Sequence, residues 1–307
     1  MKAVVQSTAL TGAALVALYT ALMSGADGIT KFIAGQFEAP QLYAISGLIV
    51  VALSLLADRH PGQRRGLKTT CPRAMALRAG ATVLAVVGFF YAFRLLPFAD
   101  VFLFVGLIPI FAGLMSGPIL GERVRPSAWA ALCAAFVGVL CLFPSGWSGV
   151  QAGHLWALSA CLLGTFSMVM ARYIGRYETN ALAQVFYPNL AIALVMGAVL
   201  PFVWKPMGLG DLAWIAGYAG LLFLARWVLV IALGRLEAYV VTPLMNLQFA
   251  WMVLIGAAFF GEYPSAGTYL GVAIVVGSGL YLLWDQYTPE SARKPIWSAR
   301  GRFRTDP

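Results

Sequence analysis

Long apolar stretches separated by short polar connections recur along the whole chain. A helix needs roughly 20 mainly apolar residues to cross the hydrocarbon core of a membrane, and each stretch has about this length. The pattern therefore predicts an all-α integral membrane protein with ten transmembrane helices. These helices are expected at 9–33, 39–57, 74–95, 99–120, 127–144, 152–174, 180–203, 209–235, 239–260 and 264–284.

The composition supports lipid as the main surroundings of the chain. Of the 307 residues, 61% are hydrophobic and only 11% are charged, against roughly 25% charged residues in an ordinary globular domain. Ten spans leave room for loops and a tail but for no separate soluble domain. The four cysteines have no CxxC spacing and are expected to be small buried apolar residues rather than disulfides or metal ligands: Cys71, Cys133, Cys141 and Cys161.

The formal net charge of +9 is concentrated in a few connections and in the tail. With a cytoplasmic N-terminus, all but four of the 21 Lys and Arg residues fall on the cytoplasmic side. This asymmetry follows the positive-inside rule and predicts that both termini are cytoplasmic, in the inner membrane. The basic segments then serve as an orientation signal, or alternatively bind lipid head groups, and nucleic acid is not an expected partner. The four remaining residues are Lys31, Arg94, Lys205 and Arg226.

A constant offset of 140 residues indicates an internal duplication. Two Gly-Glu pairs, each at the end of a predicted helix, are related by it, and so are two GxxE patterns: Gly121-Glu122 and Gly261-Glu262, and Gly35/Glu38 and Gly175/Glu178. We therefore divide the chain into repeats 1–144 and 145–284 and a basic cytoplasmic tail, 285–307. Because five helices is an odd number, the second repeat enters the membrane from the opposite face. Such inverted repeats are typical of secondary transporters that expose one site alternately to the two sides.

Two segments carry a family resemblance. Residues 88–143, with GLIPIFAGLMSGPILGE, and residues 243–284, with FFGEYPSAGTYLGVAIVVGSGLYLLW, resemble the EamA-type transporters of the drug/metabolite transporter superfamily. Asp27 and Lys31 resemble the Asp-x-x-x-Lys signature of a subgroup that includes uptake carriers for S-adenosylmethionine and riboflavin. The resemblance implies a ten-helix metabolite carrier.

Arg226 is the clearest candidate for substrate binding, because a charge inside the bilayer costs at least about 2.5–3.5 kcal/mol unless it has a partner or water. It lies within the eighth predicted helix, and its planar guanidinium suits a carboxylate or phosphate. The alternative is that it extends along the helix to the membrane interface.

Four charged residues are candidates for coupling or gating. Asp27 and Lys31 are spaced i and i+4 on one helical face, so they can pair with each other or with the third and fourth helices. Alternatively, Asp27 binds a proton and couples its movement to transport. Arg94 and Asp100 flank a short turn, where an ion pair between them would fix the turn and gate the mouth. Glu122 and Glu262 are expected to have structural roles beside helix-ending glycines, each partnering a basic loop.

The ninth predicted helix contains a proline, Pro243, followed by polar side chains. A proline frees a backbone carbonyl, which is tolerated where the backbone lines a cavity, and Pro109 and Pro188 are expected to act likewise. Asn246 and Gln248 lie on different faces, so at most one of them is central. Aromatic side chains that could stack on a planar substrate, or alternatively only pack or anchor a helix, are Tyr91, Trp227 and Trp251.

An enzyme is disfavoured by the lack of catalytic motifs. The chain has two histidines, and we find no HExxH, GxSxG, P-loop or clustered carboxylates, so we expect no cofactor, metal or catalytic residue. We predict a secondary active transporter for a small amphoteric or anionic metabolite, proton-coupled or an exchanger, and a monomer or homodimer in the lipid. A flippase for a lipid or lipid-linked sugar is the alternative.

Overall fold

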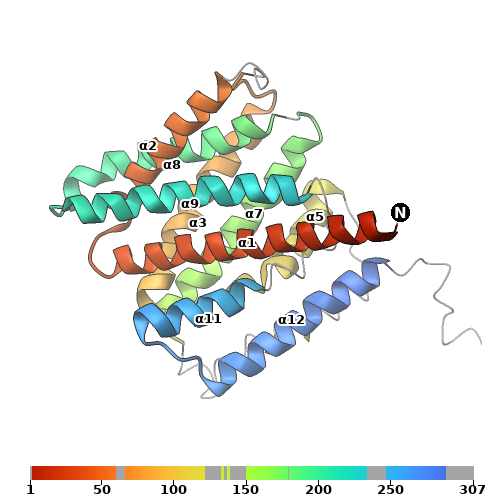
Figure 1. Ribbon diagram of the computed structural model, residues 1–307. Coiled ribbons are helices and arrows are strands. Elements are labelled where there is room, and N and C mark those ends of the chain that lie inside the picture. The colour runs from red at the N-terminus through yellow and green to blue at the C-terminus, as the bar shows by residue number, and fades with distance from the viewer. Residues whose placement is uncertain are drawn as a thin grey trace, which may run out of the picture.

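The computed structural model describes residues 2–59, 66–121, 133–134, 137–138, 150–178, 180–233 and 247–287, and the described part of the chain is helical without strands. Figure 1 shows the helices as one bundle. Their bounds are α1 Lys2–Ala34, α2 Ala39–Asp58, α3 Pro72–Leu95, α4 Phe98–Val105, α5 Ile108–Leu120, α7 Ala152–Gly175, α8 Ala181–Val203, α9 Leu209–Leu233, α11 Leu247–Phe260 and α12 Ala266–Tyr287.

The helices follow the predicted spans, with one difference. The predicted helix at 99–120 is two helices, α4 and α5, which are separated at Gly106 and Leu107. Pro109 lies at the second position of α5 and has no backbone N–H, so it cannot continue the hydrogen-bond ladder from α4. Pro188, in contrast, lies inside the continuous helix α8. The predicted span 127–144 and residues 239–246 lie largely outside the described residues.

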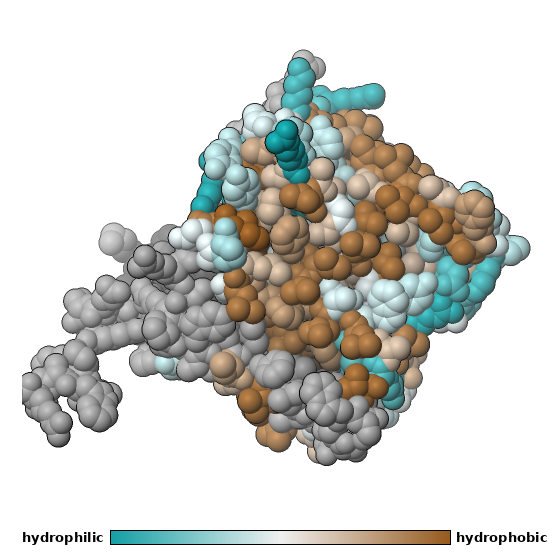
Figure 2. All heavy atoms as spheres, turned by 180° about the vertical axis from the view of Figure 1, so that it is seen from behind, coloured by the Kyte–Doolittle hydropathy of each residue, from teal (hydrophilic) through white to brown (hydrophobic). Residues whose placement is uncertain are grey.

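Several helices are long and apolar enough to cross a membrane. Among the described residues, this holds for four segments, which are α2, α3, α7 and Leu182–Val203 of α8, and further apolar helices are shorter. Large apolar side chains point outward, with Phe202 and Leu209 each 87% exposed. Figure 2 shows a broad hydrophobic area between hydrophilic groups toward the ends of the bundle. This surface is suited to lipid.

The core consists of helix pairs from distant parts of the sequence. The helix α3 packs along α7, α1 along α9, and α2 along α8; Figure 1 shows α1 and α9 side by side. Cys161 of α7 is fully buried as expected. Cys133 is exposed and Cys71, which precedes the first turn of α3, is only half-buried, so the expected burial is wrong for these two; Cys141 lies outside the described residues.

Two glycines end their helices in the expected left-handed conformation. Gly121 follows α5 with φ 69°, and Gly261 follows α11 with φ 64°. An L-residue with a Cβ is strained at such angles, whereas glycine is not. The two Gly-Glu pairs that are related by the 140-residue offset therefore share a backbone conformation at their glycines.

Gly88 allows the close approach of α3 and α7, and this can be tested by substitution. A Cβ added at Gly88 would lie 2.9 Å from the Ala160 Cβ, whereas one added at Gly80 of the same helix meets nothing within 4 Å. We expect Gly88→Ala to lower the stability by about 1–3 kcal/mol, as overpacked sites do. Thermal unfolding in detergent measures this. Gly80→Ala is the control, and an equal loss in both variants would contradict the close-packing explanation.

Candidate functional site

Polar side chains of α1 lie in one row against α11. Thr20, Ser24, Asp27 and Lys31 have the spacing i, i+4, i+7 and i+11 of a single helical face. The Trp251 indole N–H donates to the Thr20 hydroxyl at 3.2 Å. The Ser24 hydroxyl donates to the backbone carbonyl of Gln248 at 3.3 Å, and the side-chain amide of Gln248 donates to the Asp27 carboxylate at 3.1 Å. We call these four α1 residues, with Gln248, Trp251 and Glu262, the α1–α11 seam.

Lys31 joins three parts of the chain at one end of the seam. Its ammonium lies 2.9 Å from the Glu262 carboxylate and donates to the carbonyls of Leu96 at 2.7 Å and Phe93 at 3.2 Å. The second oxygen of Glu262 accepts the Phe98 N–H at 2.8 Å, at the start of α4. Of the partners expected for Lys31, the structure shows the end of the third helix, whereas its ion pair is with Glu262 and the contact with the start of α4 is made by Glu262. The expected partner of Glu262, a basic loop, is wrong, because α1 brings Lys31 to it instead.

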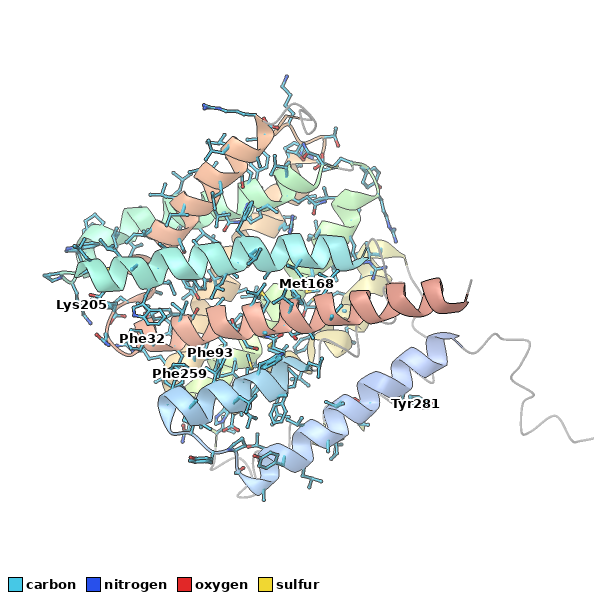
Figure 3. All side chains as sticks on the ribbon, in the orientation of Figure 1. Phe32, Phe93, Met168, Lys205, Phe259 and Tyr281 are labelled. Carbon is cyan, nitrogen blue, oxygen red and sulfur yellow. The ribbon has the colours of Figure 1, made fainter. Side chains whose placement is uncertain are left out.

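Glu38 holds a second cluster at the same end of the bundle. It begins α2 and lies 2.9 Å from Arg94 and 3.4 Å from Lys205. Figure 3 shows Lys205, Phe32 and Phe93 toward this end, which we call the Lys31 end. Burial raises the pKa of Glu38, but its hydrogen bonds and ion pairs with Arg94 and Lys205 outweigh this, so the pKa lies below its ordinary value of 4.5.

The expected ion pair between Arg94 and Asp100 is wrong. Arg94 pairs with Glu38, while Asp100 accepts a hydrogen bond from the Thr268 hydroxyl at 2.7 Å. The two side chains belong to different helices, since α3 ends at Leu95 and α4 begins only at Phe98, and each reaches a partner on another element. Arg94 thus connects to the start of α2, and Asp100 connects to α12.

The opposite end of the bundle, which we call the Glu178 end, is tied mainly through neutral partners. Glu178 accepts hydrogen bonds from the hydroxyls of Thr69 and Thr70, each at 3.0 Å, and from the Thr70 N–H at 2.6 Å. The Asn180 amide donates to the Gly66 carbonyl at 2.7 Å, and Arg176 donates to the Leu120 carbonyl at 2.8 Å. Glu178 is therefore equivalent to Glu38 in its position under the 140-residue offset. Like Glu38, it joins two connections, here the one between α7 and α8 and the one between α2 and α3.

The other candidate residues differ in how the structure places them. The Tyr91 ring packs at a tilt against that of Trp156, with ring centroids 5.1 Å apart, and edge-to-face against that of Phe90. The side chains of Arg226 and Trp227 and the whole of Asn246 lie outside the described residues, although α9 carries the backbone of the first two. No group of three or more His, Cys, Asp or Glu suited to a metal occurs within the part of the chain that the structure describes.

Several residues of these clusters were not among the predicted site residues. Thr20 and Ser24 continue the helical spacing of Asp27 and Lys31, and this signal was available in the sequence. Glu38 was noted only for its repeat, and nothing in the local sequence connects it with Lys205, which is 167 residues away.

Comparison with known proteins assigns this architecture. Residues 7–143 match the EamA-like transporter family. This part of the chain belongs to the EamA-like transporter family. The EamA-type resemblance of the sequence is therefore confirmed, and the protein has an all-α, multi-pass membrane fold.

Relatives over most of the chain are named transporters. A riboflavin transporter of Rhizobium johnstonii is 28% identical, over 85% of this chain and 82% of its own. A riboflavin transporter of Vibrio cholerae is 24% identical, over 87% and 91%. A pseudopaline exporter of Pseudomonas aeruginosa is 23% identical, over 86% and 93%. One solved crystal structure shares the fold, with a TM-score of 0.60 and 21% identity, over 92% of this chain and 99% of its own. Over most of its length, the chain is thus similar to proteins that are named as membrane transporters.

The cluster at Glu38 predicts a pH dependence of stability. The pKa of Glu38 is lower in the folded protein than in the unfolded chain. The ionised carboxylate therefore adds to the free energy of unfolding above the pKa of the unfolded chain, and this contribution is lost as the pH falls through the pKa of the folded protein. We expect Glu38→Gln to lower the free energy of unfolding by up to about 1 kcal/mol at pH 7, with no difference from wild type at the acid end. Thermal unfolding in detergent between pH 7 and pH 3 checks this, and a gap that widens toward acid would contradict it.

Proposed function

We propose that the protein is a secondary active transporter that carries a small amphoteric or anionic metabolite across the cytoplasmic membrane by alternating access. The observation that carries the proposal is the Asp27 carboxylate inside the helix bundle. Among the side chains that the structure describes, its polar partner is the neutral Gln248 amide, and no Lys or Arg forms an ion pair with it. An ionisable group in this position is expensive and is typical of a transport pathway. The relatives named as riboflavin transporters and a pseudopaline exporter support a small organic substrate.

The fold proposed for this function is two inverted repeats, 1–144 and 145–284, followed by the tail 285–307. Support comes from helix contacts that correspond under the 140-residue offset. The offset relates α3 to α9 and α1 to α7, so the packing of α3 on α7 corresponds to that of α9 on α1. It also relates α2 to α8, and these two helices pack on each other. Glu38 and Glu178 add to this support, because each ties a connection in its own repeat to a connection in the other repeat.

The proposed orientation places both termini in the cytoplasm, in agreement with the distribution of basic residues. The Lys31 end then faces outward, and the Glu178 end faces the cytoplasm. The direction of transport by such a carrier follows the gradients of the substrate and of any coupled ion.

The residues proposed for this function have separate roles. Arg226 of α9 holds an anionic group of the substrate, and Asp27 couples or gates transport. Lys31, Arg94 and Asp100 act at the gate, now with the partners Glu262, Glu38 and Thr268. The residues proposed to contact the rest of the substrate are Asn246, Gln248, Tyr91, Trp227 and Trp251.

A thermal-stability screen tests the substrate class. The purified protein would be heated with amino acids, organic acids, nucleosides, riboflavin or S-adenosylmethionine, beside Arg226→Leu. A ligand at a hundred times its dissociation constant adds about 2.7 kcal/mol to the folded state, so we expect a clear shift for at least one amphoteric or anionic compound. The shift should disappear in the variant, because the guanidinium is its proposed anchor.

Other results of the screen would change the proposal in defined ways. Equal shifts in wild type and Arg226→Leu would keep the small-molecule substrate and remove Arg226 from the site. No shift with any compound would favour a lipid-like substrate and count against the metabolite class.

Asp27→Asn tests coupling. An asparagine still accepts the hydrogen bond from Gln248, so the fold should be kept while the titratable charge is lost. In liposomes with a defined pH gradient, we expect transport by the variant to be independent of the gradient. Asp211→Asn is the control, because Asp211 accepts the Gly208 N–H in the first turn of α9, away from the seam. Unchanged gradient dependence in Asp27→Asn would remove the coupling role.

A further inference from the structure

We infer that the α1–α11 seam is the outer half of the transport pathway and that the ion pair between Lys31 and Glu262 is the latch that holds it shut. This inference rests on the proposed transport function and adds to it the place where the bundle opens. Figure 1 shows α1 and α11 as neighbouring helices. The seam between them begins at Thr20 and Trp251 and ends at Lys31 and Glu262.

The first support is the cost of this much polarity between two membrane helices. A carboxylate, an amide, two hydroxyls and an indole N–H lie along one contact, although apolar or small side chains would hold two helices together in lipid at lower cost. Polar side chains at membrane depth face water-filled cavities or pair with one another. Here they pair at 3.1–3.3 Å while the seam is closed, and they would line a hydrated passage once α11 moves away.

The second support is that α11 packs on few of the helices that the structure describes. Among the described helices, it packs mainly on α1 and α4. Its contact with α4 is largely aromatic and apolar, with Phe249 against Phe102 and Met252 in the same cluster. Such contacts are non-directional, so they allow α11 to shift against α4 while the seam along α1 opens.

The third support is the way in which Lys31 and Glu262 are held. Lys31 keeps the carbonyls of Leu96 and Phe93 as acceptors whether or not Glu262 is present. Glu262 bonds to Lys31 and to the Phe98 N–H, both on the first half of the chain. Opening therefore requires the loss of contacts at one carboxylate, while Lys31 stays satisfied by the end of α3.

The fourth support is that the lysine of the latch has no equivalent under the 140-residue offset. The 140-residue offset relates Lys31 to Ala171, which has no charge to offer, whereas Glu38 and Glu178 both exist and both tie their ends in one and the same conformation. An interaction that is present at both ends of the bundle does not favour the opening of one end over the other. An interaction whose lysine occurs in only one repeat can favour closure of one end.

The equivalent face of α7 supports this asymmetry. Thr20, Ser24, Asp27 and Lys31 correspond to small residues there, which are Ala160, Gly164, Ser167 and Ala171. This face packs closely on α3: a Cβ at Gly88 would lie 2.9 Å from Ala160, and the Ser167 hydroxyl lies 2.7 Å from that of Thr82. The small residues on α7 allow close packing that stays in place, whereas the polar residues on α1 form hydrogen bonds that can break when the two helices separate.

The test measures water access to Ser24, which is fully buried two turns from Lys31 on the same face. Ser24→Cys would be introduced into a chain whose four native cysteines are replaced by serine or alanine, and intact cells would be treated with a membrane-impermeant thiol reagent. Loss of one charge-assisted hydrogen bond shifts an equilibrium by roughly tenfold or more. We expect Glu262→Gln to raise the labelling rate of the thiol introduced at position 24 by about that factor, and Glu262→Asp to raise it less.

Two controls separate the latch from a general loosening of the Lys31 end. Asp211→Asn removes another carboxylate, which accepts the Gly208 N–H in the first turn of α9 away from the seam, and should leave the labelling of the introduced thiol unchanged. Ser167→Cys as the reporter, with Glu262→Gln, should stay unreactive. Equal labelling with and without Glu262→Gln in folded protein would overturn the inference, and so would an equal increase in Asp211→Asn.

The labelling experiment needs no substrate, so its result is independent of the ligand screen. A failed latch with a positive ligand screen would leave the proposed transporter in place with another opening route. If Glu262→Gln does not fold, as judged by gel filtration and thermal unfolding, Glu262→Asp and Lys31→Gln provide the same comparison. An unchanged labelling rate in both of these variants would likewise overturn the inference.

Discussion

A charged group in lipid has no water to bind, so the protein must supply every partner, and this constraint organises the described bundle. Lys31 illustrates it. Its side chain is only 10% exposed and is surrounded by a carboxylate, two helix-end carbonyls and the ring of Phe260. Satisfying one ammonium thus brings together the ends of α1, α3 and α11, and the start of α4 follows because Glu262 also accepts its first N–H.

The same constraint explains how much of the fold could be predicted. Helix positions followed from the length of apolar runs, because lipid forces each backbone polar group into its own helix. The break between α4 and α5 was missed even though Pro109 had been noted, since a proline does not reveal whether the chain bends or stops there. The left-handed conformation of Gly121 and Gly261 was predictable, because it is a local property.

Side-chain partners were harder to predict than helices. Arg94 and Asp100 are close in sequence and opposite in charge, yet each found a partner on another element, Glu38 and Thr268. Long side chains at helix ends can reach several neighbours, so the choice depends on helix rotation, which the sequence pattern does not specify. The row from Thr20 to Lys31 is the exception, since its helical spacing was visible in the sequence.

The length of α1 has a consequence of its own. With 33 residues at about 1.5 Å each, the helix measures roughly 50 Å, whereas the hydrocarbon core of a bilayer is about 30 Å thick. It must therefore tilt strongly, project beyond the lipid, or do both. Because the Lys31 ammonium near one tip of α1 bonds to the end of α3, the N-terminal turns are the part of the helix in which this excess length is taken up.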